Sequence, residues 1–326
     1  MKIAFVGKGG SGKTTLSSLF VRHLAASGAP VVAVDADINQ HLGAALGLDE
    51  AVAAELPAMG EQLPLIKEYL RGTNARITSA ETMIKTTPPG EGSRLLRVHE
   101  DNPVYDACAR RVELDGRAIR LMVTGPFTEA DLGVACYHSK TGAVELCLNH
   151  LVDGQSEYIV VDMTAGSDSF ASGMFTRFDI TFLVAEPTRK GISVYRQYKE
   201  YARDFGVDLK VVGNKVQGQD DIDFLRTEVG DDLLVTVGHS DWVRSMEKGR
   251  SPRFELLEDA NRRSLHTLQS AADATYELRD WERYTRQMVH FHLKNARTWG
   301  NERTGADLAA QVDPGFVLDE GLVATA

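Results

Sequence analysis

The sequence has few of the features that mark secreted, membrane-spanning or nucleic-acid-binding chains. Three cysteines in 326 residues are too few for the disulfide framework of a small secreted protein. No apolar run approaches the roughly 20 residues that a membrane-spanning helix needs. The net charge of −10 argues against a DNA backbone as the main partner. We therefore expect a globular protein of the reducing cytoplasm, without a secretory signal because a strand-like segment starts at residue 3.

A glycine-rich stretch near the start is the most informative part of the chain. Residues 7–15 read GKGGSGKTT, directly after an apolar run at 3–6 and before an amphipathic segment that starts at Leu16. Strand, glycine-rich loop and helix in this order predict a phosphate-binding loop. The loop amides and the helix start attract an anion, Lys13 adds a full positive charge, and Thr14 is placed to ligate Mg²⁺. The residues predicted to bind ATP here are Gly9, Gly10, Ser11, Gly12, Lys13, Thr14 and Thr15.

The same stretch also fits a second kind of nucleotide site. Gly7, Gly9 and Gly12 match the dinucleotide fingerprint, and Asp35 lies near the distance expected for a ribose-binding carboxylate. A dinucleotide site does not need a lysine at position 13, whereas a triphosphate site does. The loop therefore favours ATP, with a nicotinamide cofactor as the alternative.

Strand-like and helix-like segments alternate along most of the chain. Most of the strand-like runs are continuously apolar, as expected for strands that are buried on both faces. This pattern predicts an α/β fold with a mostly parallel twisted sheet and helices on both faces. The predicted strands are 3–6, 31–34, 119–124, 158–161, 180–184 and 209–212, with 235–237 as a further candidate, and the predicted helices include 14–27, 141–152, 191–205 and 220–229.

Two regions depart from this alternation and suggest a division of the chain. Residues 38–118 contain one helix-like segment near 60–71 and a Pro- and Gly-containing loop at 86–93, so we interpret them as an insertion at the sheet edge. We expect an ATPase domain over 1–270 and a C-terminal helix and tail over 271–326. Residues 270–297 look like one long helix. The acidic tail at 300–326 is expected to be mobile or ordered only against a partner.

Three aspartates follow predicted strands and are candidates for the chemistry of phosphate transfer. Asp35 and Asp37 end the second strand, and Asp162 ends the strand at 158–161. Ligands of open α/β sheets bind at the carboxyl ends of the strands, where these side chains meet. We predict that Asp35 and Asp162 hold Mg²⁺ together with Thr14, and that Asp37 positions the attacking water. Gly166 would let a backbone N–H approach the terminal phosphate.

Two further polar residues follow later strands. Asn214 can pair with an adenine edge through its side-chain amide, and Glu186 ends the preceding strand beside the expected nucleotide. An acid or an asparagine at a strand end is also a common helix cap, which is the alternative for each of these residues taken alone. Their joint placement at successive strand ends favours a nucleotide site.

Lys8 narrows the class of nucleotide-binding protein. An ordinary phosphate-binding loop has no need of a lysine after its first glycine, and the loop resembles the deviant loop of the MinD, ParA, nitrogenase-iron-protein and arsenite-ATPase class, called SIMIBI. This resemblance implies that Lys8 reaches across an ATP-bound homodimer to the partner's nucleotide and stabilises the charge that develops there. It also implies that the monomer hydrolyses ATP slowly. The alternative is a solvated loop lysine.

Within that class the chain is similar to the CooC-type ATPases that assist nickel insertion into carbon monoxide dehydrogenase. The resemblance implies a metallochaperone-like maturation ATPase that acts on a client metalloenzyme. The segments that carry it are 8–15, 35–39, 115–125, 160–166, 186–188 and 214–216.

The chain departs from the CooC pattern at its metal-binding motif. Where that family has Cys-x-Cys, this sequence reads Cys136-Tyr137-His138, and the family's Glu-His after the glycine of 160–166 is replaced by Ser167-Asp168. Cys136 and His138 from two subunits would supply four ligands suited to Zn²⁺ or Ni²⁺. The alternative is a buried cysteine that acts as a small hydrophobe.

The changes at that motif leave a second function open, a positioning ATPase of the ParA or MinD kind. Its ATP state would gate attachment to DNA, a membrane or a protein partner. The apolar stripe Trp281, Tyr284, Met288 and Phe291 could mark a membrane-targeting helix, but the acidic tail after it would be repelled by anionic lipid. We expect this stripe to pack on the core or at a dimer seam.

Overall fold

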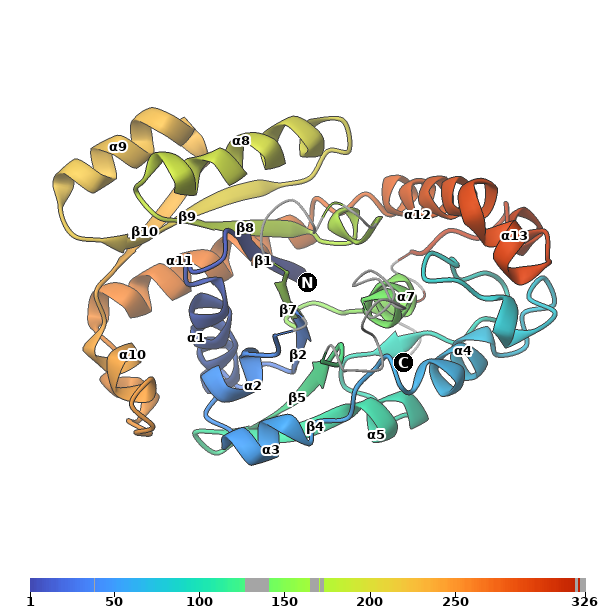
Figure 1. Ribbon diagram of the computed structural model, residues 1–326, viewed down its shortest axis with the longest axis horizontal. Helices are drawn as coiled ribbons and strands as arrows, with labels where there is room; N and C mark the ends of the chain where they lie inside the picture. Colours follow the sequence, from blue (N-terminus) through green and yellow to red (C-terminus); the bar gives the residue numbers. More distant parts are fainter. Residues whose placement is uncertain (38, 127–140, 165–169, 171–172, 320–321, 323–326) are drawn as a thin grey trace.

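The computed structural model describes residues 1–37, 39–126, 141–164, 170, 173–319 and 322 (Figure 1). Its main strands are β1 (Lys2–Gly7), β2 (Val31–Ala36), β4 (Ala109–Leu114), β5 (Arg117–Val123), β7 (Tyr158–Met163), β8 (Ile180–Ala185), β9 (Leu209–Val216) and β10 (Leu233–Gly238). They form an eight-stranded sheet in the order β10-β9-β8-β1-β7-β2-β5-β4. All neighbouring pairs in this sheet are parallel except β4–β5. The predicted parallel α/β fold is confirmed.

Helices cover both faces of this sheet. The longer ones are α1 (Lys13–Ala26), α4 (Leu63–Arg71), α7 (Gly142–His150), α8 (Arg189–Arg203), α9 (Gln219–Val229), α11 (Asp259–Tyr276) and α12 (Trp281–Asn295). Figure 1 shows α8 and α9 on one side of β8, β9 and β10, with α1 and α11 on the other. The shorter elements are α2 (Leu42–Ala45), α3 (Glu50–Ala54), η1 (Ala80–Thr82), β3 (Leu96–Arg97), α5 (Pro103–Cys108), β6 (Leu151–Val152), α10 (Asp241–Met246), the π-helical turn η7 (Ala296–Gly300), α13 (Asn301–Thr304) and η8 (Leu308–Gln311).

The continuous apolar strands follow from burial on both faces. Successive side chains of a strand point to opposite faces. In β2, Val32 and Val34 belong to the core beneath α7 and α8, whereas Val31 and Ala33 belong to the core beneath α1 and α11. Both sets must be apolar, so the strand reads as an unbroken apolar run.

The edge strand β4 was missed because it does not have this pattern. Its sequence alternates, with Val112 and Leu114 buried and Glu113 exposed between them. A tight turn at Asp115 and Gly116, both with positive φ, returns the chain into β5 as a hairpin. An antiparallel edge strand with one solvated face carries fewer apolar residues than a buried parallel strand.

The prediction of one long helix over 270–297 was wrong. Helix α11 ends at Tyr276 and α12 begins at Trp281. The Asp280 side chain accepts a hydrogen bond of 2.8 Å from the backbone N–H of Arg283, which caps the new helix. Arg279 lies in the break and is held by two buried carboxylates. Helix α11 continues through residue 270 without a break. The predicted boundary between an ATPase domain and a C-terminal part after that residue stays a prediction.

The description of the tail as mobile or dependent on a partner was also wrong over the described part of it. Leu308 and Leu318 are buried within the chain. The side chain of Gln311 donates to the Thr82 hydroxyl at 3.0 Å, and the backbone N–H of Glu91 donates to Asp313 at 3.0 Å. The tail therefore packs on the 38–118 segment of its own chain.

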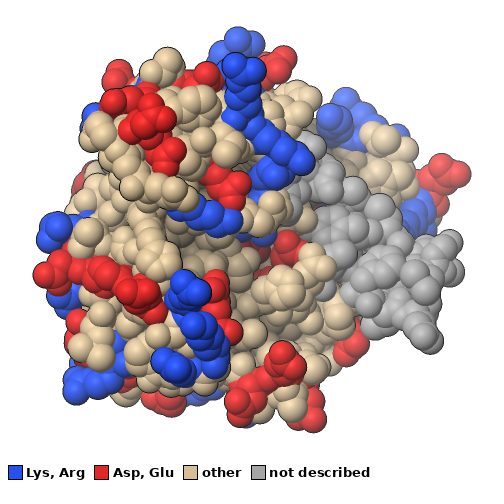
Figure 2. Space-filling view, turned by 60° about the vertical axis from the view of Figure 1, so that its left-hand side comes forward, with Lys and Arg blue, Asp and Glu red and all other residues tan. Residues whose placement is uncertain are grey.

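The apolar stripe of α12 packs inside the chain, as expected. Tyr284 and Met288 are buried in a small core with Val152 and Leu318. No helix in the described part of the chain is long and apolar enough to cross a membrane. Figure 2 shows Lys and Arg side chains interspersed with Asp and Glu over one face, as a mixed-charge surface would be.

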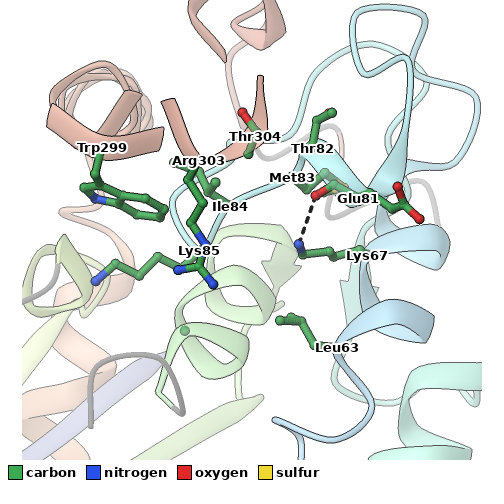
Figure 3. A pocket seen from close by; sticks show the side chains of 11 residues that line it. Leu63, Lys67, Glu81, Thr82, Met83, Ile84, Lys85, Trp299, Arg303 and Thr304 are labelled. Atoms are coloured by element: carbon green, nitrogen blue, oxygen red, sulfur yellow. Dashed lines mark hydrogen bonds between the residues drawn. The ribbon is translucent and has the colours of Figure 1, made fainter. Parts of the chain in front are cut away.

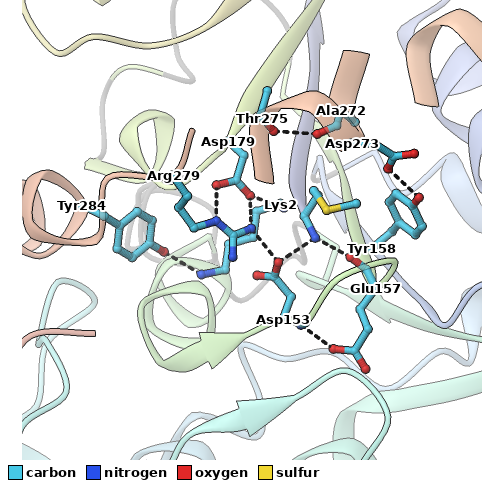
Figure 4. Close-up of polar contacts among 12 residues, drawn as sticks. Lys2, Asp153, Glu157, Tyr158, Asp179, Ala272, Asp273, Thr275, Arg279 and Tyr284 are labelled. Carbon is cyan, nitrogen blue, oxygen red and sulfur yellow. Dashed lines mark hydrogen bonds and ion pairs between the residues drawn. The ribbon is translucent and has the colours of Figure 1, made fainter. Parts of the chain in front are cut away.

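A buried ion-pair network joins the C-terminal helices to the amino ends of the central strands (Figure 4). Arg279 contacts Asp153, which follows β6, and Asp179, which precedes β8, each at 2.6 Å. Asp153 also contacts the α-amino group of Met1 at 2.6 Å. Burial alone would raise the pKa of Asp153, but this amino group and Arg279 together hold it well below its ordinary value. The Lys2 amine donates to the Tyr284 hydroxyl at 2.8 Å.

Candidate functional site

The glycine-rich loop lies between β1 and α1 and is packed tightly against two neighbouring strands. Gly12 has φ +91°, and a Cβ there would lie 2.2 Å from the Asn214 Nδ2 atom. A Cβ at Gly7, with φ +153°, would lie 2.6 Å from the Val184 carbonyl oxygen. Neither position accepts a larger residue without a shift of the loop or its neighbours. The loop conformation is thus fixed by β8 and β9 as well as by its own sequence.

The start of α1 has the properties of an anion site. No side chain caps this helix, and its first turn contains no acidic residue. Its first N–H groups therefore remain open to an external acceptor. The Ser11 hydroxyl is buried and has no hydrogen-bond partner among the described residues. The Lys13 side chain is 9% exposed and its amine lies 3.4 Å from Asp37.

Thr14 and Asp162 form the second half of the site. The Thr14 hydroxyl donates to the Asp162 Oδ2 atom at 2.6 Å. The Asp162 Oδ1 atom is buried and has no partner within the described residues. Burial raises the pKa of Asp162, although Lys13 and the Thr14 hydroxyl oppose the shift. A hydroxyl beside a carboxylate with a free oxygen fits Mg²⁺, which prefers oxygen ligands.

Asp35 is fully buried, and its carboxylate accepts hydrogen bonds from backbone N–H groups. Its Oδ1 accepts from the N–H of Asp37 at 3.1 Å, and its Oδ2 accepts from the N–H of Leu42 at 2.8 Å. Burial and the nearby Asp162 carboxylate raise the pKa of Asp35. Both oxygens already hold the turn between β2 and α2, and its predicted role as a Mg²⁺ ligand stays a prediction.

Three residues after β8 and on β9 brace the loop from one side. The Asn214 amide donates to the Ser11 carbonyl at 2.8 Å, and the Lys215 amine donates to the Gly10 carbonyl at 2.7 Å. The Lys215 amine also pairs with Glu186 at 2.5 Å. Lys215 was not among the predicted site residues, although it follows Asn214 directly at a strand end. In this structure Asn214 and Glu186 support the loop, and their predicted nucleotide contacts stay predictions.

A cavity of about 840 Å³ opens beside the loop. This volume is within the range of small-molecule sites. One wall is apolar and is formed by α2 and α10, which sequence reasoning did not assign to the site. The buried Trp242 after β10 was the available signal for this wall. The cavity is lined by Gly9, Gly10, Gly12, Lys13, Thr14, Thr15, Ser18, Leu19, Asp37, Asn39, His41, Ala44, Ala45, Glu50, Lys215, Trp242, Val243, Met246, Glu247 and Gly249.

Other predicted residues are placed differently or lie outside the described part. Lys8 is half-buried and is not in the cavity wall. Cys136, His138 and Gly166 lie outside the described residues. Within the described ranges, no group of three or more His, Cys, Asp or Glu side chains could hold a metal ion.

The comparison with protein families agrees with this geometry. Residues 3–254 match the CobQ/CobB/MinD/ParA nucleotide binding domain. The chain belongs to this family. Its match begins at β1, continues beyond α10 and includes every residue that braces or lines the nucleotide cavity. The resemblance stated from the loop sequence is confirmed at this level.

Individual relatives support the same placement. An uncharacterised ATP-binding protein of Methanocaldococcus jannaschii is 30% identical over 251 residues, covering 76% of this chain and 88% of the relative. The carbon monoxide dehydrogenase accessory protein CooC of Rhodospirillum rubrum is 27% identical, over 83% of this chain and 95% of its own. The septum site-determining protein MinD of Pyrococcus horikoshii, solved with Mg-ADP, superposes with a TM-score of 0.55 at 13% identity, over 84% of this chain and 98% of its own. That last similarity concerns the fold.

Proposed function

We propose that the protein is a Mg²⁺-dependent ATPase that works as a nucleotide-gated homodimer. The observation that carries this proposal is the arrangement of Lys13, Thr14 and Asp162 at the start of α1. A buried cation belongs to the first turn of a helix that no side chain caps, and a buried carboxylate keeps one oxygen free of partners among the described residues. These groups are complementary to a Mg²⁺-bound triphosphate. Bound Mg²⁺ would neutralise phosphate charge during transfer to water.

Different side chains of the site would bind the phosphates, the metal, the attacking water and the base. Lys13 would contact the outer phosphates, and Thr14 and Asp162 would hold the metal. Asp37 contacts Lys13 and lines the cavity, so its carboxylate is placed to orient an attacking water. The apolar wall that includes Trp242 would receive the base.

Lys8 is proposed to act on the partner's nucleotide. Its neighbours Gly9 and Gly10 are exposed, so the outer side of the loop is open to a second subunit. Among the described residues, no hydrogen bond or ion pair holds the Lys8 side chain, and it does not line its own cavity. A cation supplied in trans accelerates phosphoryl transfer by about 10³ to 10⁵ in other nucleotide hydrolases.

Subunit mixing tests this proposal. We expect Lys8→Ala and Lys13→Ala to be nearly inactive alone, whereas the exposed Lys294→Ala control should match the wild type. In a mixed dimer one site is complete, because the Lys8→Ala subunit supplies Lys13 and the Lys13→Ala subunit supplies Lys8. ATP turnover should therefore rise on mixing. A mixture with no more activity than its two components would contradict action in trans.

We further propose that the client is a metalloenzyme. The similarity to CooC supports this, and Cys136 and His138 are the proposed ligands for Ni²⁺ or Zn²⁺ between two subunits. Metal analysis of the purified dimer with and without ATP tests it. Stoichiometric metal that is lost in Cys136→Ser is expected. Absence of metal together with ATP-dependent binding to DNA or liposomes would favour a positioning ATPase instead.

A further inference from the structure

A second cavity, of about 640 Å³, lies away from the nucleotide site (Figure 3). It is an open pocket lined by residues of α4, the segment from η1 to Lys85, the start of α7, and the helical turns η7 and α13. The two cavities have no lining residue in common. Its walls combine the apolar Leu63, Met83 and Ile84 with the indole of Trp299.

Basic side chains outnumber acidic ones in the wall of this cavity, where Glu81 is the one acidic residue among the described lining residues. Lys67, Lys85 and Arg303 all line it. Among the described residues only Lys85 has a carboxylate partner, the buried Glu145 at 3.6 Å. The Lys67 amine donates to the backbone carbonyl of Glu81 at 3.4 Å. Figure 3 shows the Glu81 carboxylate pointing away from Lys67.

The charges of Lys67 and Arg303 also act on each other. Burial lowers the pKa of Lys67, the positive charge of Arg303 lowers it further, and the negative charge of Glu81 opposes the shift. An anion seated between the two side chains would relieve this repulsion and replace the water lost from the Lys67 amine. Glu81 offsets part of the positive charge in this cavity, and a bound anion would balance the rest.

The aromatic wall is held in a fixed position. The Trp299 indole N–H donates to the Asn295 side chain at 2.8 Å, and the Arg303 guanidinium lies 5.8 Å from the ring centre. Trp299 belongs to the π-helical turn η7, a rare local structure that is frequent at functional sites. A Cβ on Gly300 in the same turn would lie 2.6 Å from Leu308, so the turn is packed closely against the tail.

We propose that this cavity binds a small organic anion with an apolar or aromatic body and a single phosphate, sulfonate or carboxylate group. The anionic group would lie between Lys67 and Arg303, and the body would lie against Trp299, Leu63 and Met83. Charge-assisted hydrogen bonds to a lysine and an arginine give such a site its selectivity. The proposal does not depend on the nucleotide site.

Fluorescence titration with anilinonaphthalene sulfonate, with and without Mg-ADP, tests the proposal, and the signal is assigned to this cavity by its loss in the variants of the cavity residues. We expect saturable binding that inorganic phosphate weakens by competition. Arg303→Gln and Lys67→Gln should each weaken binding at least about tenfold. Arg297→Gln is the matched control, because Arg297 is exposed on the same turn and does not line the cavity.

A neutral probe of the same shape, N-phenylnaphthylamine, separates an anion site from a merely apolar one. It should bind much more weakly than the sulfonate. Equal binding of both probes, or unchanged affinity in Arg303→Gln, would overturn the proposal. Arg303 is exposed, so this variant is expected to fold, and an unchanged melting temperature would verify it. Failure of the sulfonate to bind the wild type at all would also overturn it.

Discussion

Carboxylates are buried at both ends of the central sheet, but their pKa values are shifted in opposite directions at the two ends. At the amino ends, Asp153 and Asp179 share Arg279, and the pKa of Asp153 is lowered. At the carboxyl ends, burial raises the pKa of Asp162. Each of the two aspartates, Asp153 and Asp162, has one buried oxygen without a hydrogen-bond partner among the described residues, so the difference lies in the charges around them. Lys13 lies nearby but contacts Asp37 at 3.4 Å.

This difference in pKa distinguishes a carboxylate that stabilises the fold from one that is available to a ligand. The charge of Asp153 is balanced by Arg279 and by the α-amino group of Met1, and Arg279, just before helix α12, also pairs with Asp179 before strand β8. A buried carboxylate whose charged form is disfavoured becomes stable when a cation arrives from outside. The contacts at the amino ends therefore support the fold, whereas we propose that the side chains at the carboxyl ends bind Mg²⁺ and phosphate. The same kind of substitution should have opposite effects at the two ends.

The largest expected effect is that of Lys13→Ala on activity. Removal of the amine eliminates a charge-assisted phosphate contact of about 1.5–3 kcal/mol. ATP affinity should fall by about tenfold to a hundredfold, and turnover should fall further because the transition state carries more charge. Calorimetric titration and phosphate release measure these changes. Turnover equal to that of the wild type would contradict a catalytic role for the residues at the carboxyl ends of the strands.

The next effect is on stability at the opposite end. Asp153→Asn leaves the buried Arg279 with one carboxylate fewer, so the free energy of unfolding should fall by about 3 kcal/mol. Because the folded-state pKa is lowered, the stabilising contribution of Asp153 is present above its ordinary value near 3.9 and is lost only in stronger acid. Denaturant unfolding at pH 5 and pH 7 should therefore show the same deficit.

Asp204→Asn is the control for Asp153→Asn, because Asp204 is 71% exposed and should tolerate the change. ADP affinity should be unaffected in both variants. A deficit of equal size in the two variants would mean that Arg279 does not depend on Asp153, and the contrast between the two ends would fail.

The smallest effect has the opposite sign. Asp162→Asn removes a carboxylate whose charged form is disfavoured in the nucleotide-free protein, so stability should rise by about 1 kcal/mol at neutral pH. The raised pKa also means that the contribution of Asp162 to wild-type stability falls as pH rises from the ordinary value toward neutrality. The variant should show a smaller fall than the wild type, because the pKa of the buried Asp35 is raised as well, to about 8. Thermal unfolding from pH 5 to pH 7.5 measures both.

Mg²⁺ binding provides a second readout of Asp162→Asn. Mg²⁺ should strengthen ADP binding by the wild type and leave the variant unchanged, which calorimetry with and without the metal can measure. A variant that is less stable than the wild type, or that keeps its response to Mg²⁺, would show that Asp162 is structural in the way that Asp153 is.

Local sequence was sufficient for the phosphate-binding loop and for most of the sheet. The loop amides, Lys13 and Thr14 lie within a few residues of one another, so their relative placement follows from a strand, a turn and a helix start. The buried strands could be predicted because both of their faces must be apolar. The edge strand β4 and the break before α12 could not, since the first is half-solvated and the second depends on Arg279.

The sequence by itself determined that this chain carries a triphosphate-type loop on a parallel α/β sheet. Only the tertiary structure decided which distant residues support that loop and which remain free. Lys215 contacts Gly10 and Trp242 closes the cavity because parallel strands far apart in sequence end at the same edge. The different partners of Asp35 and Asp162 also depend on the tertiary structure. Folding brings backbone amides to Asp35 and the Thr14 hydroxyl to Asp162.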